Sequence, residues 1–258
     1  MESIFTVRSV IPAEDRPGLA LDNIEGKNTD IVLRGVAGTR EEPHVLYFPA
    51  EYDGVLDKDY LANGILEKGG GLFWADFAKK VLKFGLHCLN EVSKEAMSVF
   101  AQAKDRYAII GPTVVMGRGF GTIPAILTAC EHEDTVLCLI LESAFPDTAS
   151  YLQAMGLEGE EAVSGDLFDL KKKISRFRKA ILFMHSHRDS MVPVSSVEWL
   201  VAESRSKATQ FQIVPSEDRW DLAYRGGALY FDTIWQFIGL RMGRRPKRRP
   251  RSARRPGP

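Results

Sequence analysis

Apolar residues along the chain fall into two alternating patterns. Short, nearly unbroken runs of apolar and β-branched residues predict strands buried on both faces. Longer segments, with apolar residues every three or four positions, predict helices that bury one face. The predicted strands are 4–10, 30–37, 44–50, 72–77, 113–121 with its turn, 135–143, 180–186 and 209–216. The predicted helices are 59–69, 84–103, 122–132, 195–206 and 226–242.

This alternation predicts an α/β fold with a mostly parallel central sheet covered by helices on both faces. Strands 4–10 and 30–37 are expected to form an N-terminal antiparallel pair, and 26–30 resembles a hairpin turn. Three glycines at 69–71 are suited to end the first helix. The acidic segment 156–166 lies where a lid is expected, but it is too short to enclose a large substrate.

Composition is that of a globular protein, with 45% hydrophobic and 26% charged residues in 258. No apolar run approaches the roughly 20 residues that span a bilayer, so no membrane partner is expected. The first residues lack the basic and apolar regions of a secretory signal, and we expect an intracellular protein, cytoplasmic or nuclear. Cys88, Cys130 and Cys138 lie in apolar contexts and are interpreted as buried thiols. We expect neither a metal site nor a cofactor.

The net charge of zero hides a division of the chain. Residues 241–258 hold nine Lys or Arg and no acid, which leaves 25 basic against 34 acidic residues, about −9, in residues 1–240. We therefore expect one folded domain over 1–240 and a disordered Arg-rich tail over 241–258. The cations proposed to bind a partner are Arg244, Arg245, Lys247, Arg248, Arg249, Arg251, Arg254 and Arg255.

Candidate chemistry centres on the stretch TVVMGRGFGTIPA, residues 113–125. A buried strand runs into glycines at 117, 119 and 121 and then into a helix, which is the pattern of a nucleophile elbow, G-x-S-x-G. Gly119 stands where the pattern has serine. The tight turn is therefore predicted without the side chain that the turn normally presents.

Four ordered motifs carry a resemblance to the α/β-hydrolase superfamily, in particular to serine hydrolases of the S33-like type. They are GRGFGTIPA at 117–125, LILESAFPD at 139–147, MHSHRDSMVP at 184–193 and VPSEDRWDL at 214–222. The resemblance extends over about residues 30–240. It implies the α/β-hydrolase fold, and it aligns the family's nucleophile with Gly119, its acid with Asp189 and its histidine with Arg219.

On this alignment only the acid of the triad remains. Gly119 has no nucleophilic atom, and the guanidinium of Arg219 cannot act as a general base. Pro49 and Ala50 replace the family's His-Gly in the oxyanion loop, and proline has no N–H to donate. The resemblance therefore implies a hydrolase frame without triad catalysis.

A few other residues of the chain could substitute for the missing members of the triad. None of the five histidines follows Asp189 in the chain, as the order of this fold requires. His185 is expected to be structural, whereas His187 could face the pocket. Ser143 and Ser186, at strand ends, are expected to satisfy local backbone groups. The N–H groups of Gly119, Phe120 and Gly121 could bind an anion at the start of the helix.

Three functions remain open from the sequence. The leading hypothesis is a non-catalytic binding or scaffold subunit with a protein partner. The second is residual esterase or peptidase activity through residues around Asp189 and His187. The third is a nucleic-acid-associated protein whose tail contacts RNA or DNA backbone. The tail also resembles a nuclear-localisation run, and docking on an acidic protein or no role at all stay open. The sequence does not indicate the oligomeric state.

Overall fold

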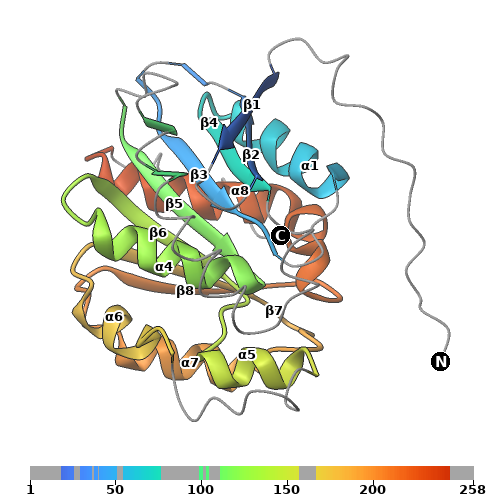
Figure 1. Cartoon of the computed structure of the whole chain (residues 1–258), viewed down its shortest axis with the longest axis vertical. Coiled ribbons are helices and arrows are strands. Elements are labelled where there is room, and N and C mark those ends of the chain that lie inside the picture. Colours follow the sequence, from blue (N-terminus) through green and yellow to red (C-terminus); the bar gives the residue numbers. More distant parts are fainter. Residues whose placement is uncertain are drawn as a thin grey trace, which may run out of the picture.

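The computed structural model describes residues 19–25, 30–36, 38–39, 41–50, 55–76, 99–100, 103–104, 111–156 and 167–244. These residues form one eight-stranded sheet with the order β1-β2-β4-β3-β5-β6-β7-β8 (Figure 1). The strands are β1 (Leu19–Glu25), β2 (Asp30–Val36), β3 (His44–Phe48), β4 (Gly71–Asp76), β5 (Thr113–Arg118), β6 (Val136–Glu142), β7 (Ala180–Ser186) and β8 (Thr209–Val214).

Six strands, β3 to β8, run parallel, and β1 and β2 extend the sheet with antiparallel pairings. The predicted N-terminal hairpin is therefore present, but its first strand was assigned wrongly. Residues 19–25, not 4–10, pair with β2, and residues 4–10 lie outside the described residues. The stretch 19–25 alternates apolar with polar residues less regularly than 4–10, which is why the periodicity favoured the wrong segment.

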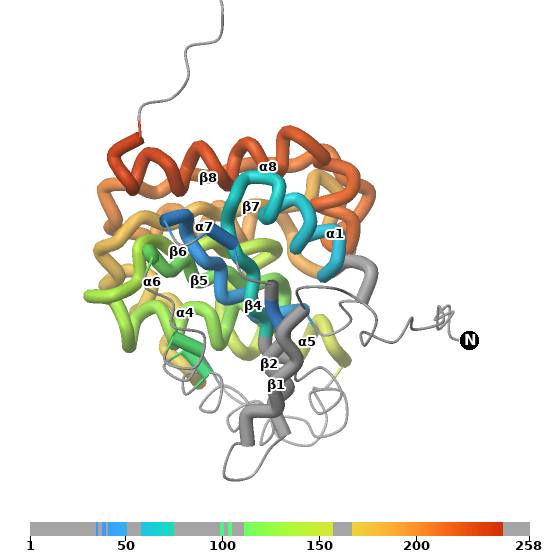
Figure 2. The backbone as a smooth tube through the Cα atoms, turned by 90° about the horizontal axis from the view of Figure 1, so that it is seen from above, coloured from blue at the N-terminus to red at the C-terminus, as the bar shows by residue number. Residues whose placement is uncertain are grey.

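Helices cover both faces of the sheet, as the alternation predicts (Figure 2). On one face lie α4 (Thr122–Glu131), α5 (Thr148–Ala154), α6 (Leu170–Arg176) and α7 (Val194–Glu203). On the other face lie α1 (Val55–Leu66) and α8 (Leu222–Arg241). Each face has its own buried apolar cluster, because side chains of alternate strand residues point to opposite sides. Most of the predicted helix 84–103 lies outside the described residues.

One glycine ends a helix and another interrupts one. Gly69 has φ of 87° and its N–H donates to the Leu66 carbonyl at 2.8 Å, so it ends α1 as predicted. Gly227, with φ of 46°, makes a kink inside α8. The helix predicted from apolar periodicity begins at residue 226, next to the kink. In the structure α8 begins one turn earlier, at Leu222.

Candidate functional site

The carboxyl end of β5 turns sharply into α4. Gly119 follows the strand with φ of 53°, a left-handed conformation that favours glycine, and begins a short 3-10 helix, Gly119–Gly121. A Cβ on Gly117 would collide with the backbone of Gly121, and a Cβ on Gly121 would collide with the backbone of Phe48. The glycine spacing thus permits the close contact of strand, turn and helix that an elbow requires.

The apex of this turn presents no reactive side chain, because it is Gly119. The hydroxyl of Thr122 donates to the Gly119 carbonyl at 2.7 Å, so it is engaged within the turn. Phe120 is fully buried. The predicted anion site at Gly119, Phe120 and Gly121 stays a prediction, because a helix start alone does not identify a ligand.

Asp189 lies in the loop after β7 and is held rigidly. Its Oδ1 accepts hydrogen bonds from the N–H groups of Met191 at 2.9 Å and Val192 at 2.8 Å. Its Oδ2 is buried and accepts no hydrogen bond from the described residues. The carboxylate is therefore oriented, with one oxygen left for a further donor.

Arg219 lies in the loop after β8, as the first residue of the 3-10 helix Arg219–Asp221. Its side chain is fully buried. The guanidinium carbon lies 4.4 Å from the ring centre of Trp220 and 5.6 Å from that of Phe145. These distances place a permanent cation among aromatic rings at the carboxyl ends of the parallel strands, where β5 and β7 also end.

Comparison with solved structures identifies the architecture. Est1E from Butyrivibrio proteoclasticus matches with a TM-score of 0.67 and 16% identity over 88% of this chain and 100% of that one. An esterase domain from Rhodothermus marinus matches with a TM-score of 0.64 and 14% identity over 85% and 97% of the two chains. The chain has the α/β-hydrolase fold.

A mouse protein, alpha/beta hydrolase domain-containing protein 10, gives a similar match, with a TM-score of 0.64 and 13% identity over 86% of this chain and 99% of that one. No family model matches the sequence. No curated protein matches it either. The α/β-hydrolase resemblance of the sequence is thus confirmed for the fold.

His185, at the end of β7, is buried within this α/β-hydrolase frame. Its Nε2 lies 3.0 Å from the Val192 carbonyl, which can only accept, so Nε2 carries the proton. Nδ1 then has a lone pair and lies 3.9 Å from Oδ2 of Asp189. Burial lowers the pKa of His185, Asp189 opposes this effect, and Arg219 adds to it. The buried hydrogen bond fits the structural role expected for this ring, and the lowered pKa keeps it neutral near pH 7.

The lowered pKa of His185 makes stability depend on pH. Below its ordinary pKa, near 6.5, the unfolded chain binds a proton that the folded chain resists, so the free energy of unfolding falls on acidification until the folded-state pKa is passed. We expect His185→Gln to reduce the slope between about pH 6.5 and 5 by up to about 1.4 kcal/mol per pH unit. Urea unfolding at each pH measures this.

His187 provides the matched control, because its side chain is exposed two residues away. The His187→Gln variant removes an imidazole but keeps the buried His185, so the two variants separate the effect of burial from the loss of any histidine. His44, whose pKa is also lowered by burial, contributes in the same direction in both variants. Equal slopes for His185→Gln and the wild type would show that His185 titrates normally in the folded protein. The exposure of His187 also argues against the alternative that it faces a pocket.

The two strand-end serines differ from each other. The Ser186 hydroxyl donates to the Ser216 carbonyl at 3.3 Å and accepts from the Arg188 N–H at 3.1 Å, as expected of a serine that satisfies backbone. Ser143 contradicts that expectation. Its Oγ is buried without a hydrogen-bond partner among the described residues, and its φ is 49°, which is unusual for a residue other than glycine.

Ser143 lies beside His185 because the Ser143 N–H donates to the Met184 carbonyl of β7 at 3.0 Å. Both residues continue the strand positions that face the α4 side of the sheet. Sequence reasoning missed this juxtaposition, since 42 residues separate the two and the left-handed conformation of a serine leaves no sequence signal.

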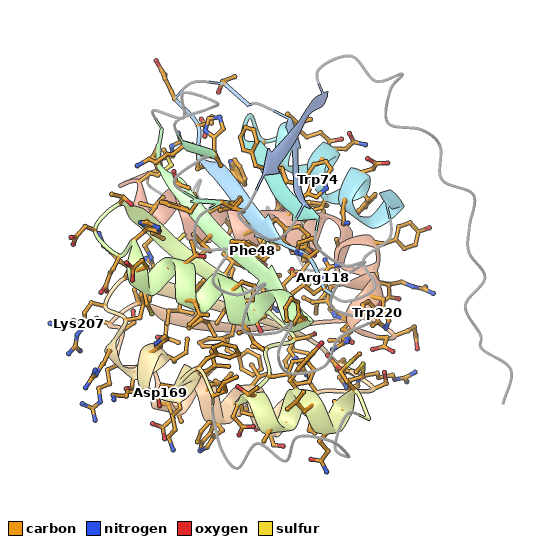
Figure 3. All side chains as sticks on the ribbon, in the orientation of Figure 1. Phe48, Trp74, Arg118, Asp169, Lys207 and Trp220 are labelled. Atoms are coloured by element: carbon orange, nitrogen blue, oxygen red, sulfur yellow. The ribbon has the colours of Figure 1, made fainter. Side chains whose placement is uncertain are left out.

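The loops after β7 and β8 are tied to each other. Ser190 Oγ donates to Asp218 at 2.8 Å, and Arg188 donates to Glu217 at 3.0 Å. Figure 3 shows Arg118 and Trp220 on the side of the molecule where β5 ends.

Within the described ranges, no three His, Cys, Asp or Glu side chains gather as a metal site would require. No helix there is long and apolar enough to cross a membrane.

The basic tail begins later than the sequence suggested. α8 continues to Arg241, and Arg244, which was predicted to bind a partner, donates two hydrogen bonds to the Glu42 carboxylate at 2.7 and 2.9 Å. The remaining predicted binding residues, 245–255, lie outside the described residues. Arg244 therefore holds the end of the domain, and its charge is already paired.

The expectation of buried thiols is confirmed for Cys138 and holds only in part for Cys130. Cys138 is buried in β6, and burial raises its pKa to about 12. Cys130, at the end of α4, is partly buried, and its pKa is raised to about 11. Neither thiol forms a reactive thiolate near neutral pH. Cys88 lies outside the described residues.

Proposed function

We propose that this chain is a non-catalytic α/β-hydrolase-fold protein that serves as a binding or scaffold subunit. The main support is Arg219, whose buried guanidinium lies against Trp220 and Phe145 where the resemblance assigns the general base. Gly119 at the elbow supports the same conclusion, because glycine offers no nucleophile. Loss of a triad nucleophile lowers turnover by about a million-fold in subtilisin.

The test compares p-nitrophenyl acetate hydrolysis by the wild type and by a Gly119→Ser, Arg219→His variant. We expect the wild type to match the buffer rate. We expect the double variant to gain measurable turnover, because the new histidine can donate to the free Oδ2 of Asp189 and accept from the new serine. Adding Asp189→Asn to the double variant should remove most of this gain. Wild-type turnover that Asp189→Asn abolishes would refute the proposal.

A second candidate is hydrolysis by residues outside the family positions. The observation that favours it is Ser143, whose hydroxyl is buried without a hydrogen-bond partner among the described residues and whose backbone pairs next to His185. Several solved structures with this fold are named esterases. A fluorophosphonate probe that labels the wild type but not Ser143→Ala would establish this candidate and exclude the first.

A third proposal concerns the residues after Arg244, which hold seven of the nine cations of the tail. We propose that they bind an acidic partner, either nucleic-acid backbone or an acidic protein surface. The truncation should follow Arg244, because Arg244 caps α8 and pairs with Glu42. Loss of single-stranded RNA binding on truncation, with a log–log salt slope of about −0.7 for each phosphate contact, would favour nucleic acid.

If full-length and truncated proteins bind RNA equally at each salt concentration, the tail is not the nucleic-acid-binding element. A matched control replaces Lys171 and Lys172, exposed cations on α6, with glutamine. This variant should retain RNA binding, because those lysines belong to the folded domain.

A further inference from the structure

The open edge of the sheet at β8 lacks the features that usually protect an edge strand. Among the described residues no strand pairs with its outer side. Its sequence, TQFQIV, contains no charge and no proline, and residues 209–213 are half-exposed. Natural edge strands are commonly protected by lysine, proline or a bulge. From the outer side of β8 we infer that this chain pairs with a second copy of itself.

The backbone defines which residues would pair. The carbonyls of Ala208 and Val214 accept hydrogen bonds from residues of β7 and its continuation, Ile181 and His187. Because a parallel ladder repeats every two residues, the even-numbered residues of β8 face β7. The N–H and C=O groups of Thr209, Phe211 and Ile213 therefore point to the open edge. The Ile213 carbonyl accepts from the side-chain amide of Gln212 at 2.7 Å, which agrees with its outward direction, and the Thr209 N–H of a second copy would replace that amide.

A two-fold axis perpendicular to the sheet makes the two β8 strands antiparallel. Centring the pair on Phe211 uses all three outward-facing residues, because Phe211 then meets Phe211 of the second copy and Thr209 meets Ile213. On the other face, Gln210 meets Gln212 of the second copy. The two faces thus pair apolar or β-branched residues with one another and amides with amides.

Charge and exposed apolar surface support the same partner. Exposed Arg205 and Lys207 precede β8, and exposed Glu217, which already pairs with Arg188, follows it. Antiparallel pairing therefore brings the two cations of each β8 start near the Arg188–Glu217 pair of the other copy, where the carboxylate can be shared. Figure 3 shows Lys207 on the side of the molecule where β8 begins, away from Arg118.

The helix α8 adds apolar surface on the same side. It packs on β6, β7 and β8 and meets α1 on its other flank. Leu229 and Leu240 are each 46% exposed and lie eleven residues apart, on one side of the helix. This side is turned away from α1, toward the β8 edge. Because the two-fold axis preserves the faces of the sheet, the two α8 helices become antiparallel neighbours, and Leu229 approaches Leu240 of the second copy.

The experiment measures the molar mass of the full chain by sedimentation equilibrium between about 1 and 100 μM. We expect the mass to rise from 28.8 kDa toward twice that value. Gln210→Lys with Gln212→Lys places like charges opposite one another and should weaken association at least about tenfold. Gln210→Lys with Gln212→Glu places opposite charges together in the Phe211-centred register and should restore the dimer. Circular dichroism verifies that each variant is folded.

Gln153→Lys on α5, also exposed, is the control and should leave the dimer unchanged. Leu229→Gln with Leu240→Gln should weaken the dimer without touching the strand. A wild type that is monomeric throughout, or a Lys–Lys variant that dimerises like the wild type, overturns the inference. A Lys–Glu variant as monomeric as the Lys–Lys variant overturns the proposed register. The inference does not depend on whether the elbow is catalytic.

Discussion

Gly121→Ala is expected to destabilise the folded domain by about 4 kcal/mol or more, enough to abolish most soluble protein. A Cβ at this position would lie 2.5 Å from the carbonyl carbon of Phe48 and 2.6 Å from the oxygen of Pro49. Both atoms belong to the backbone where β3 ends, so no side-chain rotation can relieve the collision. The elbow and the β3 loop would have to separate. Chemical denaturation of purified protein, or the soluble yield if none remains, measures the loss.

Gly239→Ala is the matched control for this prediction. Its new methyl group would meet Arg244 at an ordinary contact distance of 3.7 Å, and the residue lies within α8. Alanine should stabilise the helix by about 0.5–1 kcal/mol. If Gly121→Ala were as stable as the wild type, the packing of the elbow against the β3 loop would have to differ from the structure described here.

The core strands and the elbow were predictable because their signals are local. Continuous apolar runs such as 136–142 are typical of strands buried on both faces, and glycines two residues apart after a strand are typical of a close turn. Asp189, to which the resemblance assigns the acid, follows β7, as the predicted strand 180–186 implied. Its use of Oδ1 to hold the turn could not be predicted, since that geometry depends on the backbone conformation of the loop.

Contacts between residues far apart in the chain could not be predicted from the sequence. Arg219 was recognised as unable to act as a base, but its contact with Phe145 joins residues from loops that follow different strands. Arg244 looked like part of a disordered tail, whereas its partner Glu42 lies 202 residues earlier. The TQFQIV strand was recognised, yet only the strand order shows that it is an unprotected edge.

Charge at the end of β5 is the other feature that the sequence did not reveal. Arg118 precedes the elbow, and its Nε donates to Glu142 Oε2 at 2.7 Å. The two side chains are only 2% and 0% exposed. Arg118 and Glu142 lie opposite each other on the neighbouring strands β5 and β6. Burial raises the pKa of nearby Tyr230 well above its ordinary value, and Glu142 adds to this effect. The pair is thus a buried ion pair on the α8 face of the sheet.

Removing one partner of this pair should be strongly destabilising. We expect Glu142→Leu to lower the free energy of unfolding by about 3–5 kcal/mol, because the Arg118 guanidinium would stay buried without its carboxylate. Arg118→Met should have a similar cost for the carboxylate. The double variant, with both charges replaced by apolar groups, should recover most of the loss. Urea unfolding of the three variants and the wild type gives the coupling energy between the two sites.

The surface pair Lys68–Asp232, with N···O of 2.8 Å and side chains 34% and 51% exposed, gives the comparison. Lys68→Met should cost less than about 1 kcal/mol, because water solvates the remaining charge. Equal costs at the two pairs, or a double variant as unstable as the sum of its single variants, would contradict the argument from burial. A recovered double variant would instead show that the charges are not needed for stability. Their position directly before Gly119 and Ser143 would then point to a role in setting the backbone at the ends of β5 and β6.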